Sequence, residues 1–328
     1  MKFFKGKLTN LLFCAVLTVV FLVLVYLYAL PILIHQNSPL IRYDDHTHQG
    51  AAVVVSNNPT STPAPTQTTT QNTLPTKDTS ARTLEEDNFT GSYTLAEDWP
   101  MEKSNSSTWW VSSGGYLYSK NGVGGTIQGE LSALNPRRVA YLFSNSLDTD
   151  DGYRPQNIFR MVNKGLWKDV AQEVYFYITN NNLSESPNRN ASNGLLLFNR
   201  YQDEFNLYYT GIRVDGYAVI KKKINKEYYT MAYEKLFDGP LYDRNESPTL
   251  LPKSIWIGLR SEVETNPDDT VAIRLYMDYG HAGGWALIAE ATDDGESYGG
   301  APFHEAGHGG IRTDFMDVLF DDYSVQNL

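Results

Sequence analysis

GLLLFNRYQDEFNLYYTGIRVDGYAVIKKK, residues 194–223, is the stretch that decides the fold class. Its apolar and aromatic residues come in short runs and at alternate positions, a pattern typical of β-strands. Asp215-Gly216 separates two of the runs, and Asn225-Lys226 follows the last one. Because such pairs favour tight turns, the stretch predicts consecutive antiparallel hairpins.

The same pattern continues on both sides of this stretch, from residue 84 to the end of the chain. Short strand-like segments are separated by Gly, Asn, Asp and Pro, without a long 3.6-residue periodicity. Strands are predicted at residues 115–119, 172–179, 194–201, 205–213, 217–223, 228–235, 255–263, 270–278, 285–291 and 318–325. So many strands in one domain predict an all-β fold, a two-sheet antiparallel sandwich with long crossing connections.

The stretch also carries a family resemblance. Residues 194–203 and 206–213, followed by Asp215-Gly216 and Lys221-Lys222-Lys223, resemble the central hairpins of concanavalin A-like lectin/glucanase domains. That superfamily includes laminin-G-like modules, the group labelled 3-keto-disaccharide hydrolase-like, and several polysaccharide lyases. The ends of the domain agree with it, at residues 87–89, 110–119, 310–314 and 320–322. The resemblance covers about residues 85–325 and implies a curved jelly-roll sandwich.

The N-terminal quarter of the chain differs in composition from the rest. Residues 8–34 carry no charge and are long enough to cross the ~30 Å hydrocarbon layer as one helix. No clean Ala-x-Ala cleavage site follows, which favours a retained anchor over a cleaved signal peptide. Lysines precede the span, so the positive-inside rule places the N-terminus in the cytoplasm. The sequence thus predicts a cytoplasmic stub (1–7), a transmembrane anchor (8–34), a Thr/Pro-rich disordered linker (35–83) and an extracellular domain (84–328).

Charge and cysteine content restrict the partners of this domain. The chain has a formal net charge of −11, concentrated after residue 84, and its one cysteine is Cys14 in the apolar run. An acidic surface repels phosphate backbones, so nucleic acid is not expected as a partner. The expected partners are a glycan and, through the N-terminal helix, the cell membrane.

Alternation within the predicted strands places aromatic and basic side chains on one face. Tyr175 and Tyr177, for example, oppose the apolar Val174 and Phe176. The predicted ligand-binding set consists of Tyr175, Tyr177, Arg200, Tyr208, Arg260, Arg274, Tyr276 and Asp278. Sugar rings stack on aromatic groups while Arg and Asp bond hydroxyls or carboxylates, so these residue types predict a glycan-binding face. Ordinary solvent-facing residues of a sandwich would give the same pattern, and that alternative stays open.

Catalytic motifs of the superfamily are not found. The Glu-x-Asp-x-x-Glu strand of laminarinase-type glucanases does not occur, and Gln172-Glu173-Val174 has valine where alginate-lyase-like relatives need histidine. The favoured function is therefore a membrane-anchored, lectin-like glycan-binding module, with no catalytic residue predicted. A glycoside hydrolase or polysaccharide lyase using the same cleft is the first alternative, and a protein-adhesion module is the second.

One motif points to a different chemistry. His304-Glu305-Ala306-Gly307-His308 fits the H-E-x-x-H pattern of zinc proteases. That pattern binds zinc on a helix, where residues four apart share a face. Pro302 and the glycines at 299, 300, 307, 309 and 310 favour a loop between strands instead.

Calcium is the predicted cofactor. Relatives of this fold often clamp their first and last strands with a structural ion, and the resemblance puts Asp87, Asp321 and Asp322 at the corresponding ends. Carboxylate oxygens are ligands that suit Ca²⁺. Aspartates at such positions also cap turns without metal, so the alternative of a metal-free structure remains.

Overall fold

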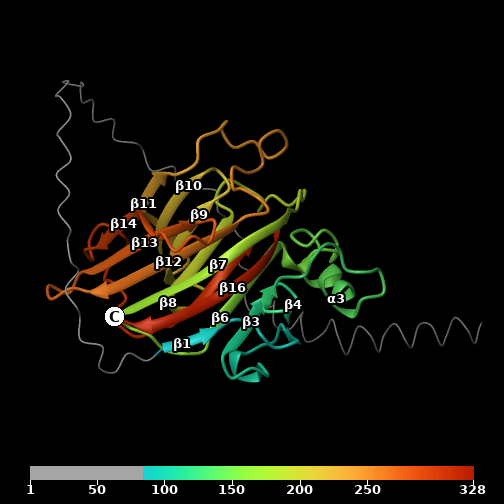
Figure 1. The fold of residues 1–328 in the computed structure, drawn as a ribbon, viewed down its shortest axis with the longest axis horizontal. Coiled ribbons are helices and arrows are strands. Elements are labelled where there is room, and N and C mark those ends of the chain that lie inside the picture. Colours follow the sequence, from blue (N-terminus) through green and yellow to red (C-terminus); the bar gives the residue numbers. More distant parts are fainter. Residues whose placement is uncertain (1–83) are drawn as a thin grey trace, which may run out of the picture.

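The computed structural model describes residues 84–328. The predicted stub, membrane anchor and linker therefore lie outside the described residues. Within residues 84–328, no helix combines the length and the apolar composition needed to span a bilayer. The described chain forms two antiparallel β-sheets that pack against each other (Figure 1).

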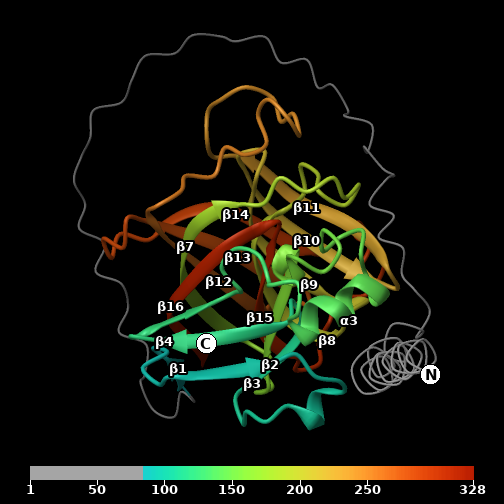
Figure 2. The same cartoon turned by 90° about the vertical axis from the view of Figure 1, so that its right-hand side faces the viewer.

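The nine-stranded sheet has the order β14-β13-β12-β7-β16-β5-β4-β2, and β1 pairs with β16 beside it. Its strands are β1 (Leu84–Asp87), β2 (Tyr93–Ala96), β4 (Tyr116–Lys120), β5 (Val123–Gly125), β7 (Val170–Asn181), β12 (Trp256–Thr265), β13 (Val271–Tyr279), β14 (Ala286–Asp293) and β16 (Met316–Asn327). The strands β7 and β16, of 12 residues each, lie side by side in the middle of this sheet (Figure 2).

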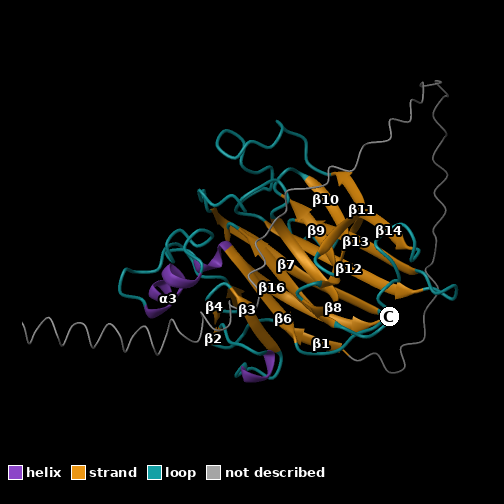
Figure 3. Ribbon diagram, turned by 180° about the vertical axis from the view of Figure 1, so that it is seen from behind, coloured by secondary structure: helices purple, strands orange, loops and turns teal. Residues whose placement is uncertain are grey.

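The seven-stranded sheet has the order β11-β10-β9-β8-β15-β6-β3. Its strands are β3 (Trp109–Ser113), β6 (Ile158–Asn163), β8 (Gly194–Asp203), β9 (Asn206–Arg213), β10 (Tyr217–Ile224), β11 (Glu227–Lys235) and β15 (His308–Asp314). The helix α3 (Pro136–Ser144) lies to the side of the sheets, near β4 (Figure 3), and two 3-10 turns are formed by η2 (Met101–Lys103) and η3 (Pro155–Asn157).

The structure confirms the predicted two-sheet antiparallel sandwich, and every predicted strand overlaps an observed one. The helix α3 was not predicted, because one nine-residue helix gives too short a periodic signal. It begins where Asn135 accepts a hydrogen bond from the Arg137 amide at 2.9 Å, with Pro136 in the first helical position. This is the usual helix start, in which a side chain satisfies an otherwise unpaired amide.

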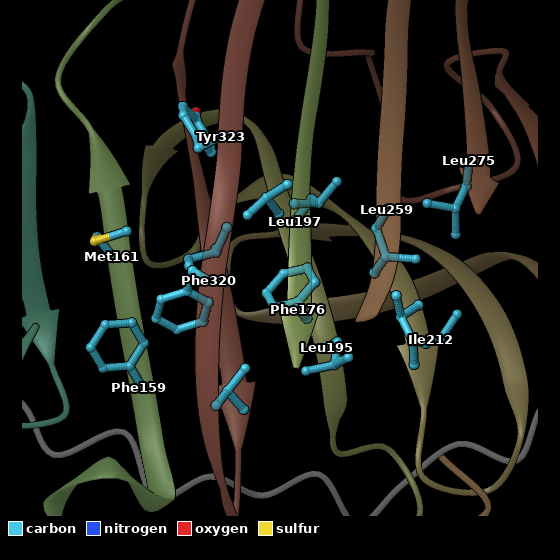
Figure 4. Close-up of a cluster of buried hydrophobic side chains, with 14 of the residues drawn as sticks. Phe159, Met161, Phe176, Leu195, Leu197, Ile212, Leu259, Leu275, Phe320 and Tyr323 are labelled. Carbon is cyan, nitrogen blue, oxygen red and sulfur yellow. The ribbon is translucent and has the colours of Figure 1, made fainter. Parts of the chain in front are cut away.

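The core lies between the two sheets (Figure 4). Phe159 from the seven-stranded sheet stacks on Phe320 from the nine-stranded sheet, with ring centroids 5.6 Å apart. Phe176 and Leu197, also from opposite sheets, are fully buried. Each such side chain stabilises the fold by roughly 1.5–3 kcal/mol on burial, so the inward positions of both sheets fix the sandwich.

Polar side chains also connect the two sheets inside this core. Gln172 on β7 donates from Nε2 to Asn199 Oδ1 on β8 at 2.7 Å, and Ser261 on β12 donates to the same oxygen at 2.7 Å. These groups are buried, and burial of an unpaired polar group would be costly. Their mutual hydrogen bonds therefore fix how the sheets lie against each other.

Candidate functional site

The outer face of the seven-stranded sheet carries a second apolar cluster, separate from the core. Alternation turns Leu195 and Leu197 inward and Leu196 outward on β8, and it turns Tyr209 and Val219 outward on β9 and β10. The buried members of this outer cluster are Trp110, Val162, Leu196, Phe198, Tyr201, Leu207, Tyr209 and Val219. A sheet with apolar side chains on both faces has one face that the sandwich core does not use.

A pocket lies on this outer face and crosses the strands. It encloses about 390 Å³ of space that is partly open to solvent, and it is lined by Ser192, Asn193, Leu196, Tyr209, Val219, Lys221, Tyr228 and Arg312. These residues come from β15, β8, β9, β10 and β11 and from the loop before β8. We call this the strand-crossing pocket. A groove that runs across neighbouring strands can hold an extended ligand against a rigid support.

A glycine lies beside the floor of the strand-crossing pocket. Gly211 lies between Leu196 and Val219, because it pairs with Leu196 on one side and with Val219 on the other. A Cβ added at Gly211 would lie 2.2 Å from the Leu195 carbonyl oxygen and 2.8 Å from a Leu196 methyl carbon. Glycine is therefore required there, because it allows β9 to approach β8 closely.

Tyrosines form the wall of the pocket. Tyr209 and Tyr228 stack with ring centroids 6.1 Å apart, and Tyr209 meets Phe198 edge-on at 5.3 Å. The Lys221 ammonium lies 5.6 Å from the centre of the Tyr228 ring. Aromatic contacts of this kind hold the rings in place, so the wall is formed before a ligand arrives.

Arg312 forms the other side of the pocket. Its Nε donates to Asp314 Oδ1 at 2.8 Å, and both side chains are buried. Burial raises the pKa of Asp314 above its ordinary value, and the neighbouring Arg312 guanidinium offsets only part of this increase. The carboxylate fixes the direction of the guanidinium, whose centre lies 5.9 Å from the Tyr209 ring.

A second, adjoining pocket extends the site. It has a volume of about 280 Å³ and shares Asn193 with the strand-crossing pocket. Asp314, which holds Arg312, lines it together with Arg189 and Asn190. The Arg312–Asp314 pair thus lies where the two pockets meet. Amide, guanidinium and carboxylate groups at that junction suit a ligand with several hydroxyls.

The predicted binding face is the outer face of the nine-stranded sheet, and the structure brings most of its residues together there. Tyr175, Tyr177, Arg260, Arg274, Tyr276 and Asp278 lie on neighbouring strands in matching register. Tyr175 packs against His281 with ring centroids 3.8 Å apart, and Tyr177 packs against Trp256 at 5.3 Å. The six residues thus lie on one face of the sheet, whereas their role in ligand binding stays a prediction.

The polar groups of that face are engaged with one another. Arg260 lies 2.8 Å from Glu262 and 3.7 Å from Glu173. Tyr276 donates to Glu262 at 3.2 Å, and Tyr175 donates to Asp278 at 2.7 Å. A ligand would have to replace these interactions, which lowers the net gain from binding.

Two predicted members of the face lie elsewhere. Tyr208 points into the core, where its hydroxyl donates to Asp293 at 2.6 Å; Asp293 also forms a buried ion pair with Lys222 at 2.8 Å. The assignment of Tyr208 to the predicted face was wrong, because β9 belongs to the seven-stranded sheet; the side chain lies on the inward side with Ile212, and the buried carboxylate accepts from its hydroxyl. Burial and the hydrogen bond to Asp293 raise the pKa of Tyr208.

Arg200 is also placed away from the predicted face. The pairing of β8 with β9 is irregular after Asn199, and Arg200 has a left-handed φ of 46°. Its buried guanidinium contacts Asp169 at 3.1 Å and the Thr265 hydroxyl at 2.8 Å. The assignment of Arg200 to the predicted face was wrong because β8 belongs to the seven-stranded sheet, and the bulge turns the side chain away from the outer face of that sheet as well.

The predicted calcium ligands have other partners. Asp87 accepts from Trp109 Nε1 at 2.7 Å and from the Phe89 amide at 2.8 Å, whereas Asp322 lies 3.1 Å from His281 Nε2. Asp321 accepts from the Asp322 amide at 2.8 Å. Among residues 84–328 no three His, Cys, Asp or Glu side chains are grouped as a metal site. The calcium clamp stays a prediction, which a lower melting temperature after chelation would support.

The H-E-x-x-H motif does not form a helix. Residues 302–307 lie in a loop, and His308 is the first residue of β15. The His308 Nδ1 atom lies 2.9 Å from the Gly165 carbonyl oxygen. The expectation of a glycine-rich loop between strands is confirmed, and the helical geometry of zinc proteases is not formed.

Comparison with known proteins finds relatives only among solved structures. No family model matches the chain, and no curated protein matches it. A carbohydrate-binding module, CBM66, from Bacillus subtilis is 13% identical, with a TM-score of 0.40, over 67% of this chain and 95% of its own. A Bacillus subtilis protein of unknown function with a galectin-like fold is 12% identical, with a TM-score of 0.37, over 74% of this chain and 97% of its own.

An enzyme also appears among the similar structures. A Bacillus licheniformis β-glucanase is 11% identical, with a TM-score of 0.36, over 73% of this chain and 98% of its own. The structure shares with these proteins no more than 13% identity, and its two antiparallel sheets agree with the sandwich that residues 194–223 predicted.

Proposed function

We propose that residues 84–328 form a carbohydrate-binding domain and that the glycan lies in the strand-crossing pocket. The observation that carries this proposal is the composition of the pocket: tyrosines Tyr209 and Tyr228, an aliphatic floor of Leu196 and Val219, and polar side chains around them. Sugars present apolar C–H faces and many hydroxyls, so they need stacking surfaces and hydrogen-bonding groups side by side.

Binding is favoured over glycoside hydrolysis by the carboxylates present. Hydrolysis of a glycosidic bond normally uses two carboxyl groups on opposite sides of the bond. Among the residues that line the two pockets, Asp314 is the one carboxylate, and it is bonded to Arg312. A single buried, paired carboxylate supports a binding role.

We also propose that this domain is held at the outer surface of a cell membrane. The support is the uncharged apolar segment 8–34, preceded by Lys2, Lys5 and Lys7 and followed by a Thr/Pro-rich stretch. Accessibility to a protease added outside intact cells tests this topology. Digestion of the domain in intact cells is expected, and protection until the cells are lysed would contradict it.

A glycan array tests the binding function. The full-length protein is purified in detergent because of its apolar segment, and each bound glycan is afterwards analysed for shortening or for new double bonds. Binding to intact ligands is expected. A double variant, Lys221→Ala with Tyr228→Ala, is expected to lose about tenfold or more in affinity, because one stacking contact and one charged group are removed.

The opposite face provides the competing variant. Tyr177→Ala, Arg274→Ala and Tyr276→Ala are combined on the nine-stranded sheet. If this triple variant loses binding while the pocket variant keeps it, the site is on the face predicted from sequence. Shortened glycans would establish an enzyme instead of a binding module.

A further inference from the structure

The strand-crossing pocket has a charge opposite to that of the whole chain. The chain carries −11, yet the residues that line this pocket include two cations, Arg312 and Lys221, and no carboxylate. Clefts lined by one sign of charge concentrate ligands of the opposite sign. The pocket therefore favours an anion in a protein that otherwise repels anions.

A second arginine stands beside Arg312. Arg160 on β6 is the direct cross-strand partner of Arg312 on β15. Directly opposed residues in an antiparallel pair have Cβ atoms roughly 4.5–5.5 Å apart, and like charges at such a position destabilise the sheet. The arginine pair therefore costs stability in the absence of a counter-charge.

The acidic side chains nearby offset this cost in part. Asp314 bonds to Arg312, and Glu204 at the β8–β9 turn lies 4.0 Å from Arg160. On the nine-stranded sheet, by contrast, the single side chain of Arg260 lies near two carboxylates, 3.7 Å from Glu173 and 2.8 Å from Glu262. The protein thus matches arginine with several carboxylates on one face, and on the other it leaves a pocket without lining carboxylates.

The register shows how one ligand would meet both kinds of group. Reading across the sheet, a single row runs Arg160, Arg312, Leu196, Gly211 and Val219. Its first two members are cationic and its last three form an apolar floor. A sugar ring over the floor would direct a substituent toward the arginines, and Arg binds carboxylate and sulfate in a planar, two-pronged geometry.

We propose that the ligand is an acidic glycan, with a carboxylate or sulfate held by Arg312 and Arg160 and a further contact to Lys221. This inference rests on the proposed glycan-binding function and specifies its substrate class. Asp314 keeps Arg312 oriented, so the cationic end of the row is in place before the ligand binds.

Matched ligands test the inference on the full-length protein. Oligogalacturonate is compared with its methyl ester, and a heparin-derived oligosaccharide is compared with its desulfated form, so that carboxylate and sulfate are tested separately. Acidic forms are expected to bind about tenfold or more tightly than their neutral forms, because hydrogen bonds to charged groups are stronger than those to neutral groups. Raising the salt from about 0.1 M to about 1 M is expected to reduce this preference, since screening shortens from ~10 to ~3 Å.

Two variants test which cations give the preference for acidic ligands. Arg160→Gln and Lys221→Gln are each expected to reduce the preference for the acidic ligand several-fold. Lys235→Gln is the matched control, because Lys235 is an exposed lysine of the same sheet, pairs with Asp238 at 2.7 Å and lies outside the pocket lining. Unchanged melting temperatures show that the variants are folded.

The outcomes separate the two proposals. Equal binding of acidic and neutral forms, or an equal loss in the Lys235→Gln control, would overturn the acidic-ligand inference while leaving glycan binding in place. No binding of any glycan, including the neutral members of the array, would overturn the proposed function itself.

Discussion

The two outer faces of the sandwich contain similar residue types but use them differently. On the nine-stranded sheet, Tyr175, Arg260 and Tyr276 bond to acidic neighbours of the same face. On the seven-stranded sheet, Tyr209, Tyr228 and Arg312 surround a pocket of about 390 Å³. Aromatic and basic residue types therefore do not identify a binding surface; the arrangement of their polar groups does.

Ring packing explains part of the difference. On the nine-stranded face, the rings of Tyr175 and Trp285 cover Gly258, since a Cβ added there would lie 2.7 Å from Tyr175 Cε1 and 2.8 Å from Trp285 Cη2. On the seven-stranded face, Tyr209 and Tyr228 line a pocket together with Leu196 and Val219. From this comparison we expect substitutions on the first face to change stability and substitutions on the second to change binding.

Asp278→Ala should have the largest effect on stability. Asp278 is buried and accepts hydrogen bonds from Tyr175 and from the amides of Ala282, Gly283 and Gly284. We expect the free energy of unfolding to fall by about 3 kcal/mol, because bonds to a charged group are lost and several donors are left unpaired. Urea denaturation of the full-length protein measures this change.

Asp278→Asn is the control, since its amide oxygen can still accept some of these bonds and the loss should be smaller. Glycan affinity of the folded fraction is expected to stay within about twofold of wild type for both variants. A large affinity loss without a stability loss would contradict the structural role assigned to this face.

Val219→Phe should affect binding as well as stability. Val219 lies in the pocket floor and is buried among the outer cluster. We expect glycan affinity to fall about tenfold or more, because the larger aromatic ring changes the shape of the floor. The free energy of unfolding should fall by about 1–3 kcal/mol, since a larger side chain overpacks a filled cluster.

Val219→Ala adds no volume and no polar group, so it serves as the matched control for the added bulk. Titration calorimetry with the tightest ligand from the array compares the two variants. Full affinity in Val219→Phe would show that the strand-crossing pocket is not the binding site, whatever the effect of the change on stability.

The sequence predicted the architecture because each strand carries its own signal. Alternation in residues 172–179, 255–263 and 270–278 gave both the strands and the outer face of the nine-stranded sheet, as the register confirms. Alternation requires regular pairing, however, and it does not give the direction of the Arg200 side chain, because a bulge interrupts β8 there. Local pattern is therefore sufficient for faces of regular strands and insufficient at irregularities.

The pocket could not be predicted in the same way, because it is assembled from distant strands. Arg312 and Leu196 become neighbours only through the pairing of β15 with β8, which no local pattern specifies. One signal was available. In residues 194–213 both alternate sets of positions are apolar or aromatic, with Leu196 and Tyr209 opposite Leu197 and Tyr208. Two apolar faces on one hairpin indicate a second apolar surface beyond the core.

Glu173→Gln should have the smallest effect, and it examines the electrostatics of the nine-stranded face. Burial raises the pKa of Glu173 above its ordinary value of 4.5, and Arg260 offsets this shift only in part. A carboxyl group with a raised pKa holds its proton more tightly in the folded state, so its ionisation reduces stability as the pH rises through that pKa. Glutamine does not ionise. The unfolding free energy of the variant relative to wild type should therefore increase from pH 4 to pH 7, by roughly a few tenths of a kcal/mol for a partly exposed pair. Urea denaturation across this range measures the difference. A decrease instead would mean that Arg260 outweighs burial, and that the ion pairs of this face stabilise the fold more than the raised pKa implies.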